Sequence, residues 1–307
     1  MKEQLLILLS TSIYIIVIGA EILFSHLHLK KYYSIKETLM NVYLCLANSA
    51  IDLSFRLVYV VILWWFYKFH FMDMGAYPIF YWTLLFFGED FLFYFEHRAD
   101  HFCRIFWAVH VTHHSSEEFN LTTGFRSSVL QPLYRFVYFI PLALMGFRPA
   151  DIVLMYSITQ IYGILVHTQY IRKMPEWFEA IFVSPSHHRV HHASNVRYLD
   201  RNMGMVLIIW DRLFGTFQAE LPGDPVKYGL VKNVPDPHHF PQVVLHEFRN
   251  VQIDISKKLS LRIRLKYLFM PPGWSHDGST LTAAQQRKVT LRKEPANQAQ
   301  QPSLVHG

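Results

Sequence analysis

Cysteine is scarce in this chain of 307 residues, which contains only Cys45 and Cys103. Two distant cysteines without a CxxC motif exclude a disulfide framework and a thiolate metal site, and they are too few for an iron–sulfur cluster. The sequence also lacks a GxGxxG fingerprint and an HExxH motif, so it indicates neither a dinucleotide-binding fold nor a zinc hydrolase of the HExxH class. Any metal chemistry therefore has to come from histidine.

Acidic residues are in the minority, because 29 Lys and Arg residues outnumber 23 Asp and Glu residues and give a formal net charge of +6. A basic excess of this kind suits either nucleic acid or the anionic head groups of lipids. Apolar residues make up 51% of the chain and occur in long runs. The runs favour lipid head groups, and we expect no nucleic-acid partner.

Long apolar runs predict an all-α integral membrane protein. The first run, residues 5–24, has the length of a membrane-spanning helix and lacks the cationic start and cleavage site of a signal peptide. Two more runs cover residues 43–67 and 77–95, and two shorter ones, 130–145 and 152–166, flank the turn GFRPAD. The shorter pair either spans as thin helices or forms a re-entrant hairpin. We expect four to five membrane helices, the hairpin included, below a cytosolic helical cap that carries the site.

The basic residues between these runs predict the orientation. The loop after the first run contains Lys30, Lys31 and Lys36, whereas the loop between the second and third runs contains only Lys68. By the positive-inside rule the first loop is cytoplasmic. The third run then ends in the cytoplasm, where the histidine-rich segments begin. We expect a multi-pass protein of the bacterial inner membrane or the endoplasmic reticulum, with its active site on the cytoplasmic face.

Inside the second run, Asp52 and Arg56 lie one helical turn apart. Charged side chains within a membrane span are costly unless they are paired, and the i, i+4 spacing allows a pair to form. We therefore expect a buried structural ion pair at this position.

Composition divides the chain into four regions. Residues 1–89 form an N-terminal transmembrane region, residues 90–217 contain the histidine-rich segments, and residues 218–282 form a C-terminal cytosolic extension with Pro and Gly turns. From residue 283 to residue 307 the chain is polar and Gln-rich, which predicts a disordered tail.

Histidine is concentrated in three segments, HRADH, HVTHH and HRVHH. In an α-helix, residues three and four positions apart share one face and lie about 5–6 Å apart at Cβ. A helix that carries HxxHH can therefore offer imidazoles to two neighbouring metal ions. Nine histidines converge on one membrane face, which is too many for one ion, so the spacing implies two metals. These candidate ligands are His97, His101, His110, His113, His114, His167, His188, His191 and His192.

Imidazole suits iron, zinc, copper and nickel about equally well, so the ligand type alone does not choose the metal. A nearly all-nitrogen site beside apolar helices fits iron that activates O2 against an unreactive C–H bond. Two other classes stay open, a histidine-rich metal transporter or sensor and a zinc-dependent membrane hydrolase. A transporter needs ionisable residues through the membrane, and a zinc hydrolase needs an open zinc site and no O2.

The three segments resemble the histidine boxes of the fatty acid hydroxylase/sterol desaturase superfamily of integral-membrane di-iron oxygenases. Two longer segments, THHSSEEFNLTTGFRSSVLQ and SPSHHRVHHASNVRYLDRNMGMVLIIWDRLFGTF, are similar to the alkylglycerol monooxygenase branch and its bacterial relatives. The resemblance covers about residues 90–217. Phe102 follows the first box, where the branch has an acidic residue, and this departure leaves the exact substrate and a pterin reductant open.

The resemblance implies that the nine histidines hold two iron ions (Fe2+). It implies an oxidoreductase that uses O2 to hydroxylate, or desaturate, a C–H bond of an alkyl lipid, an acyl lipid or a sterol-like lipid. Because the sequence lacks a fused redox domain, we expect a separate electron donor. That donor is an electron carrier, or tetrahydrobiopterin if the chain works like an alkylglycerol monooxygenase.

Four residues are candidates for orienting the ligand rings, since a ligand histidine usually donates its free N–H to a carboxylate or carbonyl. Asp90 lies seven residues before the HRADH box, on the same helix face. His187 pairs with a box histidine four positions on, although it falls outside the HxxHH pattern. Asn120 and Asp211 match the family pattern, and a helix cap or a turn explains them equally well.

Overall fold

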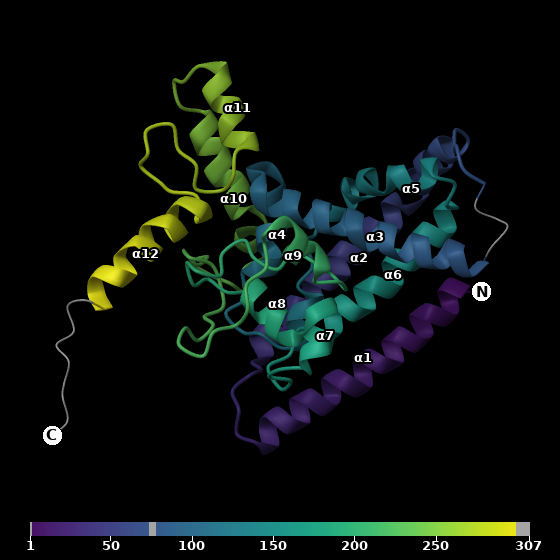
Figure 1. Ribbon diagram of the computed structural model, residues 1–307, viewed down its shortest axis with the longest axis horizontal. Helices are drawn as coiled ribbons and strands as arrows, with labels where there is room; N and C mark the ends of the chain where they lie inside the picture. The colour runs from purple at the N-terminus through teal and green to yellow at the C-terminus, as the bar shows by residue number, and fades with distance from the viewer. Residues whose placement is uncertain (1, 74–77, 299–307) are drawn as a thin grey trace.

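The computed structural model describes residues 2–73 and 78–298, and its elements are helical (Figure 1). Three long helices come first, α1 (Lys2–Leu27), α2 (Ile35–Tyr67) and α3 (Pro78–Phe102). Within the described residues the only strand-like pairing is an isolated bridge between Phe182 and Leu207, so the expected all-α class is confirmed. The shorter elements are α4 (Arg104–His114), η1 (Leu121–Phe125), η2 (Gln131–Leu133), η3 (Arg135–Phe139), α5 (Ile140–Leu144), α6 (Pro149–Leu165), α7 (Glu176–Ile181), α8 (Pro185–His191), α9 (Ile209–Phe214), α10 (Phe240–Ile255), α11 (Leu261–Phe269) and α12 (Ala283–Gln298).

Two helices, α1 from Ser10 onward and α2, are long and apolar enough to cross a membrane. Leu53, Leu57 and Val61 of α2 are 70%, 74% and 57% exposed. Such a row of apolar side chains is unfavourable in water and favourable in lipid. These two helices correspond to the first two expected membrane runs. The total number of membrane helices stays a prediction.

The expected hairpin has one broken arm and one continuous arm. Residues 130–145 form η2, η3 and α5 instead of one helix, because Pro132 and Pro141 lack the N–H that a continuing helix needs. The longest helical stretch of this arm, Arg135–Leu144, is too short to cross a bilayer. Gly146, with φ of 101°, begins the turn toward α6. This geometry favours the re-entrant alternative over a pair of thin spanning helices.

An apolar core joins the long helices at the end that is remote from the histidines. Leu63 of α2, Leu85 of α3, Leu142 of α5 and Ile152 of α6 are buried and belong to one cluster. Burial of each such side chain contributes about 1.5–3 kcal/mol. The core therefore fixes α2, α3 and α6 around the space that they enclose.

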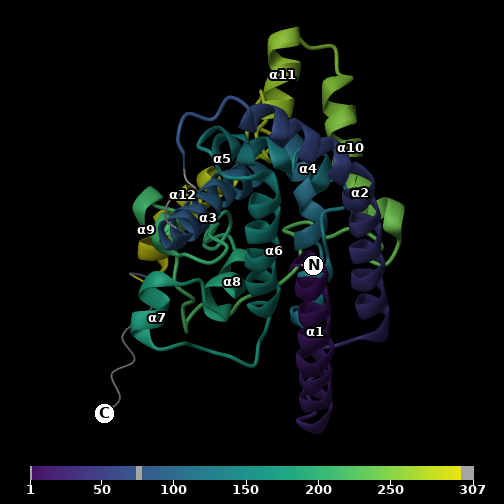
Figure 2. The same ribbon diagram turned by 90° about the vertical axis from the view of Figure 1, so that its right-hand side faces the viewer.

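The C-terminal extension supports the helix that carries the second histidine box. α10 and α11 stand side by side at one end of the molecule (Figure 2), and both pack against α4. Arg104, the first residue of α4, donates hydrogen bonds to Glu247 at 2.8 Å and to Asp254 at 2.7 Å, both on α10. Since these groups are partly buried, solvent screens the pairs less than it screens exposed ones. The extension thus fixes the orientation of α4.

The prediction of a disordered tail is wrong for Ala283–Gln298, which form α12. A capping box starts this helix, because Thr282 Oγ1 accepts from the Gln285 N–H at 3.4 Å and Gln285 Oε1 accepts from the Thr282 N–H at 2.9 Å. The segment is also rich in Ala, Gln, Lys and Arg, which are good helix formers. Residues 299–307, the rest of the predicted tail, lie outside the described residues.

Candidate metal centre

Three helices and one loop position the histidines. α3 ends in HRADH, so His97 and His101 lie one turn apart on the same face. Cys103 has an extended backbone and turns the chain from α3 into α4, which carries HVTHH. α8 begins at Pro185, whose fixed φ suits the first helical position, and carries HRVHH as far as His191, with His192 as its C-cap. His167 lies two residues after the end of α6.

The nine candidate ligands lie in two groups. Within each group, one ligand atom of every member lies within 4.8 Å of those of the other members. Each HxxHH box is divided, since its first and last histidines join one group and its middle histidine joins the other. This division is what two neighbouring metals would need from one helix. The five-histidine group contains His97, His101, His110, His114 and His191, and the four-histidine group contains His113, His167, His188 and His192.

The Nε2 atoms approach one another within both groups. His110 Nε2 lies 3.1 Å from His97 Nε2 and 3.2 Å from His114 Nε2. In the other group, His167 Nε2 lies 2.9 Å from His188 Nε2. Two nitrogens bonded to one metal ion at about 2.1 Å and at right angles are about 3.0 Å apart. The observed spacing therefore fits nitrogens that share an ion.

On the other side of the ring, four of these histidines contact a backbone carbonyl through Nδ1. A carbonyl oxygen only accepts, so Nδ1 carries the proton and the Nε2 lone pair remains available to a metal. The four pairs are His97 with Met203 (2.8 Å), His113 with Arg126 (3.0 Å), His167 with Gly163 (2.7 Å) and His191 with Arg201 (2.9 Å).

Two aspartates lie behind rings of the five-histidine group. His101 Nδ1 is 3.3 Å from Asp200 Oδ1, and His110 Nδ1 is 3.6 Å from Asp100 Oδ2. Carboxylates in this place fix the ring and raise the basicity of the ligand nitrogen. Motif spacing does not identify either residue. Asp100 lies inside the HRADH box, and this position was the sequence signal that could have identified it. Asp200 is 99 positions from His101, so no local pattern indicates their contact.

Several buried nitrogens in these groups have no hydrogen-bond partner. Among the described residues, His101 Nε2 and His191 Nε2 are buried and unpaired. Buried polar atoms are rarely left without a partner, and a lone pair directed at a metal ion explains both. The donor set therefore fits a metal centre. The assignment of each histidine as a ligand remains a prediction.

Burial keeps the imidazoles neutral. Loss of solvent lowers the pKa of His113 to about 4. It also holds the pKa values of His114, His188 and His191 well below the usual value of about 6.5, with a further contribution from repulsion between neighbouring histidines. A neutral ring keeps the lone pair that a metal needs.

Asp90 and Asp211, which the sequence suggested as partners of the ligand rings, bind a loop instead of an imidazole ring. In the described part of the chain, no hydrogen bond joins Asp90 or Asp211 to a candidate ligand. Asp90 accepts from the N–H of Val206 at 2.9 Å, and Asp211 accepts from the N–H of Met203 at 2.7 Å. Because the Met203 carbonyl contacts His97, the two aspartates position that ring through the loop.

Asn120 and His187 take part in the N-terminal capping of η1 and α8. Asn120 Oδ1 accepts from the Thr122 N–H at 3.0 Å at the start of η1. His187 takes part in the capping box of α8, where its Nδ1 accepts from the Ser184 N–H at 3.3 Å. His187 belongs to neither histidine group.

A cavity of about 630 Å³ extends from the histidines into the space between α1, α2, α3 and α6. Its wall includes His97 and His110 of the five-histidine group and His113, His167 and His188 of the four-histidine group. Its volume is typical of small-molecule sites, which range over about 300–1,000 Å³. The cavity gives a small molecule access to both groups.

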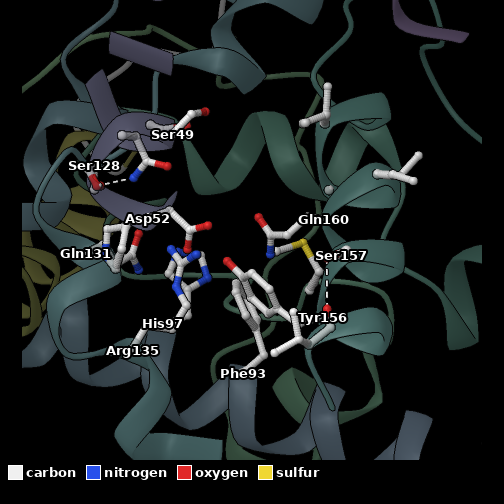
Figure 3. Close-up of a pocket in the computed structure, with 18 of the residues that line it drawn as sticks. Ser49, Asp52, Phe93, His97, Ser128, Gln131, Arg135, Tyr156, Ser157 and Gln160 are labelled. Carbon is white, nitrogen blue, oxygen red and sulfur yellow. Dashed lines mark hydrogen bonds between the residues drawn. The ribbon is translucent and has the colours of Figure 1, made fainter. Parts of the chain in front are cut away.

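The ion pair of α2 lines this cavity, and Figure 3 shows Asp52 of the pair in the cavity wall. Arg56 Nη2 lies 2.5 Å from Asp52 Oδ2, and the side chains are 38% and 28% exposed. The predicted pairing is confirmed, whereas the prediction that the pair is buried is wrong. The reason is that the neighbouring helices enclose a space in front of this face of α2 instead of packing against it.

Residues 82–216 match the fatty acid hydroxylase family model. This match confirms the resemblance drawn from the three boxes. The matched region runs from α3 to just beyond α9, so it includes all nine candidate ligands.

Individual relatives share this region. Alkylglycerol monooxygenase of Homo sapiens is 38% identical over 196 residues, which are 63% of this chain and 42% of the relative. Alkylglycerol monooxygenase of Danio rerio is 40% identical over 163 residues, 53% of this chain and 36% of the relative. Ornithine lipid hydroxylase OlsE of Rhizobium tropici is 31% identical over 130 residues, 42% of this chain and 39% of the relative. The chain thus spans less than half the length of these relatives. No solved structure matches it significantly.

Proposed function

We propose that this protein is a membrane-bound, O2-dependent di-iron oxygenase that hydroxylates or desaturates a C–H bond of a lipid. The observation that carries this proposal is the convergence of nine histidines into two groups at one end of a cavity. The names of the relatives, alkylglycerol monooxygenase and ornithine lipid hydroxylase, support a lipid substrate. An alkyl lipid, an acyl lipid or a sterol-like lipid is the expected class.

The number and spacing of the nitrogens favour iron over zinc. Zinc centres in proteins are usually tetrahedral, with four ligands, and catalytic zinc has only three from the protein. The five-histidine group exceeds this number. Nitrogens at about 2.1 Å from a tetrahedral ion are about 3.4 Å apart, whereas the Nε2 atoms lie as close as 2.9 Å. Bound iron would supply the activation of O2 that attack on an unreactive C–H bond requires.

The residues of the chain hold the metals and present the lipid. The histidines would bind through Nε2, while the carbonyls behind Nδ1 and the carboxylate of Asp200 keep the rings in place. Phe93, Phe136 and Phe139 contribute apolar surface to the cavity wall, which suits a hydrocarbon chain and excludes water. Electrons would come from a separate donor, an electron carrier or tetrahydrobiopterin.

We place the centre on the cytoplasmic face of a multi-pass membrane protein, in the bacterial inner membrane or the endoplasmic reticulum. Two candidate spans, in α1 and α2, support membrane insertion. Lys30 and Lys31 lie between them and Lys36 lies in the first turn of α2, and these charges support a cytoplasmic position for that loop.

Metal analysis together with oxygen uptake tests the proposed function. We expect about two metal ions per purified chain, one for each histidine group, and lipid-dependent O2 uptake that Fe2+ restores to metal-stripped protein. Isolated protein that contains zinc agrees with the proposal, since zinc binds imidazole more tightly than Fe2+ does. Full activity with one metal and inert iron would overturn it. Lipid hydrolysis without O2 uptake would indicate a zinc hydrolase, and metal flux into vesicles without turnover would indicate a transporter.

A further inference from the structure

The middle of the cavity wall is polar. On α2, Asp52 and Arg56 form their ion pair, and the hydroxyl oxygen of Tyr59 lies 3.4 Å from Asp52 Oδ1. All three residues line the cavity. A charged pair within a membrane helix is costly and usually marks a functional position. Because this pair faces the cavity, a molecule inside the cavity can contact it.

The opposite wall offers an unpaired donor. Gln160 of α6 lines the cavity, and its Nε2 is buried without a hydrogen-bond partner among the described residues. The Nε of Arg56 is also buried without a hydrogen-bond partner among the described residues. Figure 3 shows Asp52 and Gln160 approaching the same space from opposite sides. Buried donors rarely stay unpaired, so both N–H groups fit an acceptor supplied by a ligand.

These polar groups lie at a defined distance from the histidines. Gln160 precedes His167 by seven residues, and the helical part of this segment, which ends at Leu165, rises by about 8 Å. Farther from the histidines, Leu63, Phe139 and Ile152 line the cavity with apolar side chains. The order along the cavity is therefore the histidines, the polar groups and an apolar end.

We propose that Asp52, Arg56 and Gln160 form a recognition subsite for an uncharged, hydroxyl-bearing group of the lipid. This inference rests on the proposed function, because it deepens the choice of substrate. By holding that group at a fixed distance from the histidines, the subsite selects which C–H bond of the lipid is presented to the metal centre.

The charges of the subsite decide the chemistry of the ligand. Asp52 accepts a hydrogen bond from a hydroxyl group, while Arg56 and Gln160 donate to oxygen atoms. A group with neighbouring hydroxyl or ether oxygens satisfies both requirements. A phosphate or carboxylate meets repulsion from Asp52, and Asp52 already neutralises the charge of Arg56. A plain hydrocarbon leaves the buried donors unpaired.

Binding of a lipid probe to the purified full-length chain in detergent tests the subsite without turnover. The probes are hexadecane with vicinal hydroxyl groups at one end (the diol), unsubstituted hexadecane, and hexadecyl phosphate. We expect the native protein to bind the diol about tenfold more tightly than hexadecane, the effect of one or two hydrogen bonds. Gln160→Leu, and Asp52→Leu combined with Arg56→Met, should bring this ratio close to one and leave hexadecane binding unchanged.

Ser54→Ala is the matched control, because Ser54 lies on the exposed side of α2 and its hydroxyl donates to the Ala50 carbonyl of the same helix at 2.7 Å. It should keep the native ratio. A native ratio in Gln160→Leu and in the double variant would overturn the proposal, as would tighter binding of hexadecyl phosphate than of the diol to the native protein. If the double variant does not fold, Gln160→Leu decides alone. Binding needs neither iron nor O2, so failure of the proposed oxygenase activity would not affect this result.

Discussion

The two histidine groups differ in what holds their rings. In the five-histidine group, His101 and His110 lie close to the carboxylates of Asp200 and Asp100. In the four-histidine group, the Nδ1 partners seen for its rings are backbone carbonyls, as for His113. A carboxylate behind a ligand ring makes that ligand more basic than a carbonyl does. We infer that the five-histidine group holds its ion more tightly.

The groups also differ in their contact with the cavity. Two members of the five-histidine group line the cavity, whereas three of the four members of the other group do so. The four-histidine group thus combines fewer protein ligands with greater contact with the space that a lipid and O2 would enter. The five-histidine group is thus suited to holding a metal, and the four-histidine group is suited to meeting small molecules.

The largest effect is expected in a test of membrane topology, because the two histidine groups can exist only if all their histidines lie on one side of the membrane. Topology reporters fused after Ser34, Ser115 and Gly223 should all report the cytoplasm, and a reporter fused after Phe71 should report the opposite side. The reason is that the positive-inside rule predicts a cytoplasmic position for the basic loop after α1. Opposite signals from Ser115 and Gly223 would place the two HxxHH boxes on different sides, and the two groups could not exist.

Loss of one ligand from each group should have unequal effects. His192→Ala leaves three histidines in its group, and we expect the metal content to fall from about two ions to about one with loss of activity. His114→Ala leaves four histidines in its group, so more metal should remain, although activity should fall strongly. Mass spectrometry of purified protein gives the metal content.

The control for both variants is His246→Ala. His246 lies on α10, outside both groups, and its Nδ1 contacts the Gln242 carbonyl of the same helix at 3.1 Å. It should keep both metals. Equal metal loss from His114→Ala and His192→Ala would contradict the inference that the five-histidine group is the tighter one.

A smaller loss of metal affinity is expected when the carboxylate of Asp200, which lies behind the His101 ring, is removed. Asp200→Asn should lower metal affinity by about 10–100-fold, and only for the ion of the five-histidine group. Asn tolerates the left-handed backbone at this position, where φ is 52°, so the loop should keep its shape. Competition with a chelator measures the affinity. Asp277→Asn, in an exposed loop, is the control, and an equal fall in both variants would remove any special role for Asp200.

The spacing of the histidines predicts the division into two groups, but other parts of the centre are not visible in the sequence. A backbone carbonyl, such as that of Met203 or Gly163, is present at every residue, so no residue type indicates which one will face a ring. Asp200 reaches His101 only through tertiary folding. The sequence also shows that Asp52 and Arg56 can pair, but only the packing of the helices shows that the pair faces a cavity.

The smallest effect is expected at His187, the immediate neighbour of a candidate ligand. His187→Ala removes the ring that accepts from the Ser184 N–H, while the hydrogen bond from the His187 N–H to Ser184 Oγ remains possible. Loss of part of a capping box costs about 1 kcal/mol of unfolding free energy, and both metals should be retained. Thermal unfolding and metal content should be measured beside His188→Ala, which removes a member of the four-histidine group. Metal loss as complete in His187→Ala as in His188→Ala would make His187 a ligand, and the division of the centre into five and four histidines would then be wrong.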